Sequence, residues 1–190
     1  MTVSPQPRLG GQIIADQLQV LGATKVFCVP GESFLGMLDG LYEHRAQIQV
    51  ITCRHEGGAA NMAEAHGKLT GLPGVCAVTR GPGATNASNG VHTAFQDSTP
   101  MILLIGQVGL DMMEREAFQE IDYRRMFGQM AKWVAQIDDP ARIPEYLSRA
   151  WTVAQSGRPG PVVLALPEDV LSGEARVADA RPMKIAAPAP

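Results

Sequence analysis

Three segments of the sequence combine glycine or proline with polar side chains, a combination suited to holding a small ligand. They are Val29–Ser33 (VPGES), Cys53–Gly58 (CRHEGG) and Thr79–Asn86 (TRGPGATN). Glycine lets the backbone approach a ligand closely, while a few polar groups fix the orientation of the ligand. Each segment directly follows an apolar run, and we expect the three together to form one site.

Glu56 is the main candidate for acid–base chemistry in these segments. It opens a Gly/Ala-rich helix, Gly57–Ala65, whose small residues let another backbone or a flat ring come close. The helix N-terminus favours the charged carboxylate, whereas burial in an interface favours the protonated form. If burial prevails, Glu56 can share a proton with a ligand nitrogen. Otherwise it is an ordinary acid of a first helical turn.

Three familiar motifs are incomplete in the same segments. Gly81–Asn86 lacks the last glycine of G-x-G-x-x-G and the lysine of a P-loop, so it predicts only a weak phosphate site. Gly31–Leu35 ends in leucine where the nucleophile elbow G-x-S-x-G needs glycine. Position 59 is alanine where the zinc motif H-E-x-x-H needs histidine. These gaps argue against a serine hydrolase and a zinc enzyme.

Six apolar runs are expected to form the strands that position these segments. Strands buried on both faces of a parallel sheet are continuous apolar runs, and their alternation with amphipathic stretches is typical of β/α units. Ligands bind beyond the carboxyl ends of such strands, so the three segments should converge on one edge of the sheet. The expected strands are Lys25–Val29, Gln49–Thr52, Val75–Thr79, Met101–Ile105, Lys132–Ile137 and Pro161–Leu166.

Helices are expected between the strands. Apolar residues recur at helical spacing over residues 13–21, 34–41 and 143–154. Gly22 is expected to end the first helix, and Asp139-Pro140 to begin the last. The charged, aperiodic stretch Val108–Arg125 predicts a long functional loop with one helical turn.

Composition narrows the class of protein. The chain has 190 residues, of which 45% are hydrophobic, and a net charge of −3, enough for one domain with a short tail. No basic cluster is present, so neither nucleic acid nor an anionic membrane is an expected partner, and no apolar run is long enough to span a membrane. The cysteines Cys28, Cys53 and Cys76 form no C-x-x-C pair, which favours reduced, buried thiols in a cytoplasmic protein.

In combination, the ordered motifs resemble the N-terminal pyrimidine-binding domain of thiamine-diphosphate enzymes of the acetolactate synthase and pyruvate oxidase group. The resemblance rests on VPGES, RHEGGAANMAEAHGKLTGLPGVCAVTRGPGATN, DSTPMILLIGQV, AFQEID and SGRPGPVVLALPEDV, in unbroken order. It implies an α/β fold for residues 9–174, flavodoxin-like, with three α/β/α layers and a six-stranded, mostly parallel sheet. Residues 1–8 are then expected to be a disordered N-terminus, and residues 175–190 a linker toward a missing central domain.

The resemblance assigns roles to individual residues. It implies that Glu56 hydrogen-bonds the pyrimidine nitrogen N1′ and so favours the imino tautomer that activates the cofactor at C2. Pro30 and Gly31 match positions that line the pyrimidine pocket. Pro82 and Asn86 match residues that pack on or near the ring, although a proline between glycines also suits a rigid turn.

A further role implied by the resemblance is that of Gln119, which corresponds to an active-site glutamine near the reaction centre. Gly57 stands where similar enzymes commonly have glutamine, a difference that bears on substrate preference more than on cofactor chemistry. The G-D-G motif that holds Mg²⁺ and the diphosphate in a C-terminal domain of such enzymes does not occur in this sequence. The isolated chain is therefore expected to bind the cofactor weakly and to be inactive.

Three hypotheses for the function remain open. The first is the N-terminal domain of an acetolactate synthase-like enzyme, a transferase or lyase that acts on 2-keto acids by decarboxylation with carboligation. Similar members often bind FAD outside this domain, and the resemblance implies a homodimer or tetramer. The second is a stand-alone subunit of a split 2-keto acid decarboxylase. The third is a non-catalytic flavodoxin-like binding module.

Overall fold

The structure is a computed structural model that describes residues 6–183. Residues 1–5 of the expected disordered N-terminus, and residues 184–190 of the expected linker, lie outside the described residues. The boundaries expected for the domain stay predictions.

One parallel sheet forms the centre of the molecule. Its strand order is β3-β2-β4-β5-β7-β6, and every neighbouring pair is parallel. All six predicted strands are confirmed, with ends that differ by at most two residues. β5 is two residues longer than predicted because Gly106 and Gln107 continue the pairing with Leu166 and Pro167 of β7. The strands are β2 (Lys25–Cys28), β3 (Gln49–Thr52), β4 (Gly74–Val78), β5 (Met101–Gln107), β6 (Trp133–Gln136) and β7 (Pro161–Pro167).

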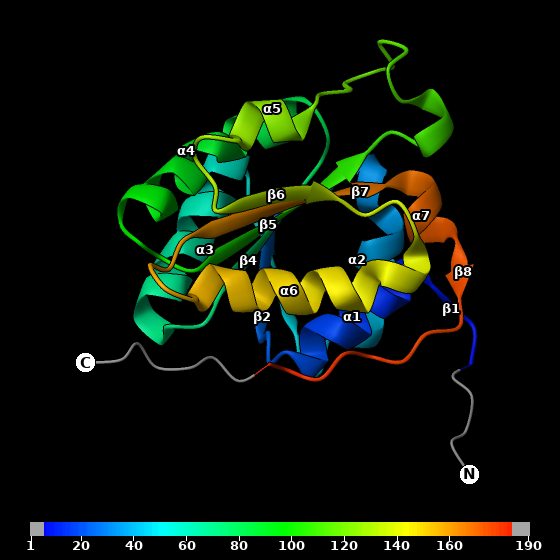
Figure 1. Cartoon of the computed structure of the whole chain (residues 1–190), viewed down its shortest axis with the longest axis horizontal. Coiled ribbons are helices and arrows are strands. Elements are labelled where there is room, and N and C mark those ends of the chain that lie inside the picture. The colour runs from blue at the N-terminus through cyan, green and yellow to red at the C-terminus, as the bar shows by residue number, and fades with distance from the viewer. Residues whose placement is uncertain (1–5, 184–190) are drawn as a thin grey trace.

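Helices cover both faces of the sheet (Figure 1). One face carries α1 (Gly10–Val20), α2 (Leu35–Glu43), α6 (Ile143–Gln155) and α7 (Glu168–Ser172). The other carries α3 (Glu56–Thr70), α4 (Pro82–Gln96) and α5 (Tyr123–Phe127). The three-layer, flavodoxin-like α/β/α fold is therefore confirmed. No helix within residues 6–183 has both the length and the apolar character to cross a membrane.

Helix ends follow the predicted signals, with one shift. Gly22 follows α1 in the left-handed region, with φ of 88°, as expected of a residue that stops a helix. The Asp139 side chain accepts a hydrogen bond from the Ala141 backbone N–H, which caps a short 3-10 turn, Pro140–Arg142. The α-helix proper begins only at Ile143, because this turn comes first. A second 3-10 turn, Glu32–Phe34, likewise precedes α2.

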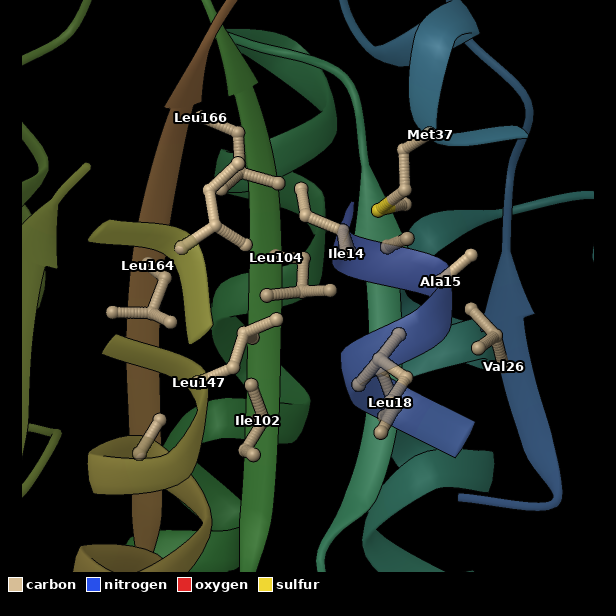
Figure 2. Close-up of a cluster of buried hydrophobic side chains, with 14 of the residues drawn as sticks. Ile14, Ala15, Leu18, Val26, Met37, Ile102, Leu104, Leu147, Leu164 and Leu166 are labelled. Carbon is tan, nitrogen blue, oxygen red and sulfur yellow. The ribbon is translucent and has the colours of Figure 1, made fainter. Parts of the chain in front are cut away.

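The core on the α1 side is built from large aliphatic side chains (Figure 2). Ile14 and Leu18 of α1 pack with Leu147 of α6 over the central strands, where Ile102 and Leu104 are 0% and 1% exposed. Burying one such side chain stabilises the fold by about 1.5–3 kcal/mol. This layer anchors the strands whose ends carry the three predicted segments.

On the other side, α3 and α4 contribute mainly small residues to the core, so these two helices lie close to each other and to the sheet. A Cβ atom at Gly90 of α4 would come within 2.5 Å of the Ala60 Cβ on α3. A Cβ atom at Gly74 of β4 would come within 1.8 Å of the Ala63 carbonyl oxygen. Only glycine fits at either position without movement of the backbone.

A second, two-stranded sheet joins the two ends of the described chain. β1 (Arg8–Leu9) pairs antiparallel with β8 (Glu174–Ala175). Beyond β8, residues 176–183, here called the C-terminal segment, run back along α1. The fully buried side chain of Gln17 donates to the Ala180 carbonyl oxygen at 2.9 Å and accepts from the Ala180 N–H at 2.7 Å.

Candidate functional site

The three predicted segments lie at the carboxyl ends of three neighbouring strands. β2 lies between β3 and β4 in the sheet, and its own connection to β3 places α2 on one face. The next connection, from β3 to β4, places α3 on the opposite face. The boundary between β2 and β4 is therefore the topological switch point, the position where open α/β sheets bind ligands.

Glu56 and Asn86 meet at this edge. Glu56 is the first residue of α3, and His55 before it caps the helix by accepting the Gly57 N–H at Nδ1, 3.0 Å away. Asn86 lies on α4, and its Nδ2 donates to Glu56 Oε2 at 2.9 Å. Within residues 6–183, no hydrogen bond occupies the second carboxylate oxygen, Oε1. Because Glu56 is half-buried and not fully enclosed, Oε1 is the carboxylate oxygen that can still accept a hydrogen bond from a ligand.

Two glycines let Thr79 pack closely between the ends of β2 and β4. A Cβ atom at Gly83 would come within 2.8 Å of Thr79 Cγ2 and within 3.6 Å of Glu56 Oε1. A Cβ atom at Gly31 would come within 2.6 Å of the Thr79 Cβ atom. Thr79 itself is held by a 2.8 Å hydrogen bond between its hydroxyl and that of Ser33. The ends of β2 and β4 thus interlock around Thr79, which places Gly31 and Gly83 near the same threonine.

The remaining predicted binding residues are on the surface. Pro30, Pro82 and Asn86 are exposed. Pro82 is the first residue of α4, a position where its fixed φ and its missing N–H cost nothing. Its role in forming the turn is therefore visible in the structure, beside any contact with a ligand. The site is an open edge that a ligand would cover from outside.

Gln119 reaches this edge from the long loop after β5. The loop contains a 3-10 turn, Leu110–Met112, and leads into the single helical turn of α5, as predicted. Gln119 has φ of 65°, which is unusual for a residue other than glycine. Its backbone lies against Gly81, where a Cβ atom would come within 2.8 Å of the Gln119 carbonyl oxygen. The structure thus places Gln119 beside the turn that leads to Pro82.

Two residues of this edge were not predicted from the sequence. Arg80 is 8% exposed although charged, and Tyr123 is 3% exposed. The Tyr123 hydroxyl accepts the Gly81 N–H at 2.9 Å, and burial raises the pKa of Tyr123 to about 12. The phenol therefore keeps its proton at neutral pH. An arginine two residues after the apolar strand β4 was a visible signal, whereas no sequence pattern near Tyr123 indicated its role.

The cysteines fit the predicted structural role only in part. Cys28 and Cys76 are fully buried, and desolvation raises the pKa of Cys28 to about 11 and that of Cys76 well above its ordinary value. Cys53 is only half-buried because it follows β3, the edge strand of the sheet. Burial still raises the pKa of the Cys53 thiol. None of the three is an activated thiolate.

Comparison with known proteins identifies relatives of this domain. Residues 8–126 match the family described as thiamine pyrophosphate enzyme, N-terminal TPP binding domain. A probable acetolactate synthase large subunit from Methanocaldococcus jannaschii is 41% identical over 165 residues, which cover 87% of this chain and 28% of the relative. The acetolactate synthase large subunit of Lactococcus lactis is 40% identical over the same proportions.

A third relative gives the same result. The acetolactate synthase isozyme 3 large subunit of Escherichia coli is 39% identical over 163 residues, or 86% of this chain and 28% of that protein. The chain therefore spans little more than a quarter of the length of these relatives. The family match covers more than half of the chain. On this evidence, the chain belongs to the thiamine pyrophosphate enzyme family, as an N-terminal TPP-binding domain of the acetolactate synthase-like type.

Proposed function

We propose that this domain binds the pyrimidine ring in an acetolactate synthase-like enzyme that acts on 2-keto acids by decarboxylation with carboligation. The observation that carries the proposal is the pairing of Glu56 with Asn86 beside Gly83, at the switch point of the sheet. The names of the relatives support the reaction class.

The residues at this edge fit a flat, nitrogen-containing ring. Within residues 6–183, Oε1 of Glu56 accepts no hydrogen bond, and the missing side chain of Gly83 lets Thr79 pack there without crowding this oxygen. Asn86 binds Oε2 and thereby fixes the orientation of the carboxylate. A neutral carboxylic acid at Oε1 can share its proton with a ring nitrogen such as N1′. When bound, thiamine diphosphate supplies the electron sink that decarboxylation of a 2-keto acid requires.

The other predicted residues complete the proposed site. Pro30 and Gly31 at the end of β2 line the ring from one side, and Pro82 lines it at the start of α4. Gln119 approaches from the loop over Gly81 and is the group that we propose faces the substrate. A Cβ atom at Gly57, which follows Glu56, would come within 3.0 Å of His55 Nδ1, and we propose that the missing side chain at this position bears on which substrates fit.

The diphosphate requires residues beyond this set. Within residues 6–183 no group of three or more His, Cys, Asp or Glu side chains could hold a metal ion. We propose that Mg²⁺ and the diphosphate are bound by another domain or chain that covers the open edge, and that FAD, in a flavin-dependent enzyme, binds there too. The assembly would be a homodimer or tetramer in the cytoplasm, and this domain alone would be inactive.

Substitution of Glu56 tests the proposal. The variant E56Q keeps the shape of the side chain and its contact with Asn86 but cannot carry the proton. In the enzyme that contains this domain, exchange of the C2 proton of thiamine diphosphate, followed by NMR in deuterated water, should slow by roughly 10²–10⁴-fold. The matched control is E43Q, which neutralises an exposed carboxylate on α2. Exchange at the unmodified rate in E56Q, with the cofactor bound, would refute the proposal.

A further inference from the structure

Arg80 ties together three segments that are far apart in the chain. It lies two residues after β4, separated from the strand by Thr79, and its guanidinium pairs through Nη1 with Glu168, the first residue of α7. Its Nε donates to the Phe118 carbonyl oxygen at 3.1 Å. Its backbone N–H donates to the Ser33 hydroxyl at 3.2 Å. A buried guanidinium is costly unless it is paired in this way, so these contacts account for its burial.

The loop that Arg80 holds has little regular structure of its own. Glu114, Glu116 and Gln119 all have positive φ values, between 53° and 65°. The Phe118 side chain is 74% exposed, so it contributes little burial to anchor the loop. Two backbone N–H groups in the loop donate to the Glu120 carboxylate, which closes the loop on itself without attaching it to the sheet. The tie from Arg80 therefore attaches the middle of the loop to the end of β4.

This tie acts directly on Gln119. The Phe118 carbonyl oxygen and the Gln119 N–H belong to one planar peptide unit, so a bond to that oxygen also orients the start of Gln119. Gly81, the neighbour of Arg80, packs against the Cα atom and carbonyl oxygen of Gln119. Two consecutive residues thus fix the backbone of Gln119 on both sides.

We propose that Arg80 is a positioning residue, which holds Gln119 at the edge of the site while Glu168 holds its guanidinium in place. The importance of Gln119 to catalysis rests on the proposed function. The order that Arg80 imposes on the loop does not, so the two can be tested separately.

The loop is tested in the 190-residue chain by hydrogen exchange and mass spectrometry. R80M, which removes the charge and the donors but keeps an unbranched side chain, should speed exchange in peptides covering residues 117–121 by roughly tenfold or more, because a charge-assisted contact is lost. R80K should restore part of the protection. E168Q, which keeps Arg80 and its packing, should give an intermediate increase. Exchange in β5 reports whether each variant remains folded.

The matched control is R158M. Arg158 also binds backbone carbonyl oxygens, those of Phe95 and Gln96 at the end of α4, but lies away from the loop. R158M should leave exchange in residues 117–121 unchanged. Wild-type exchange there in R80M or E168Q, with β5 still protected, would overturn the proposal. If R80M does not fold, E168Q decides the question.

A second readout separates positioning from general stability. In the complete enzyme, R80M should lower kcat for the 2-keto acid by roughly tenfold or more while the C2 proton of the cofactor still exchanges at the normal rate, because Glu56 is untouched. Loss of both together would contradict a role specific to Gln119. Failure of the E56Q test would refute the proposed function and leave the hydrogen-exchange result standing.

Discussion

The hydrogen bond between Asn86 and Glu56 makes a definite prediction for the variant N86D. The substitution replaces the amide donor with a second carboxylate of nearly the same shape, 2.9 Å from Glu56 Oε2 in the starting geometry. N86A serves as the comparison, since it removes the donor without adding charge. N86D and N86A also differ in helix propensity, so the repulsion is isolated by comparing the two variants in both the Glu56 and the E56Q background, where that difference cancels.

The size of that difference follows from the distance. Two unit charges 2.9 Å apart repel by about 1.4 kcal/mol at the dielectric constant of water, and by more where solvent is excluded. Asn86 is exposed, so an aspartate there can rotate partly away and reduce the repulsion. We expect N86D to have a free energy of unfolding about 1 kcal/mol below that of N86A at pH 7 and low salt.

Urea unfolding followed by circular dichroism measures this difference. The repulsion requires both carboxylates to be charged, so the gap between N86D and N86A should close in acid, where one carboxylate takes up a proton. It should also narrow in high salt. In the double variant E56Q/N86D the hydrogen bond is reversed, because the amide of the glutamine can donate to the carboxylate of the aspartate. This variant should recover the stability lost in N86D. Equal stability of N86D and N86A at pH 7, or no recovery in the double variant, would show that the two side chains do not interact.

Two further predictions concern other parts of the domain. A thiol with a pKa of about 11, as at Cys28, is only about 0.1% thiolate at pH 8. Iodoacetamide should therefore label the half-buried Cys53 well before Cys28, and labelling of Cys28 should rise about tenfold per pH unit. Mass spectrometry of the labelled peptides checks the order, and early labelling of Cys28 would contradict its burial. Q17L removes both hydrogen bonds to Ala180, a loss of about 1–3 kcal/mol. Trypsin should therefore cleave after Arg176, the arginine of the C-terminal segment that is not followed by proline, faster than in the unmodified chain. An unchanged cleavage rate would show that Gln17 does not hold this segment.

The central strands of the sheet were predictable because they are buried on both faces, unlike the partly exposed β3 and β6. A run such as Met101–Ile105 has no polar residue to obscure it, so its position and type were visible in the sequence. The pair β1 and β8 was not visible, because two-residue strands have no period and depend on contact between opposite ends of the chain. Gln17 was missed for the same reason, since its partner is far away in the sequence.

The residues of the candidate site also differ in how far local sequence could predict them. Spacing relative to the strands was enough to place Glu56, Gly31 and the Gly81–Asn86 turn at one edge of the sheet, and the structure places them there. Gln119 could be named only through the resemblance, because its loop has no periodic pattern. The contacts of Arg80 arise from the folded chain alone, as they join residues from three separate connections.

The close packing of α3 and α4 has a consequence for the behaviour of the site on heating. Gly90 leaves no free space between α4 and the backbone around Ala60, so the helices that carry Glu56 and Asn86 cannot slide past each other by small steps. Thermal motion should then move the backbones of the two helices as one unit, while the exposed Asn86 side chain can still change rotamer. The backbone positions of Glu56 and Asn86 relative to each other should therefore persist with rising temperature until the helices themselves separate.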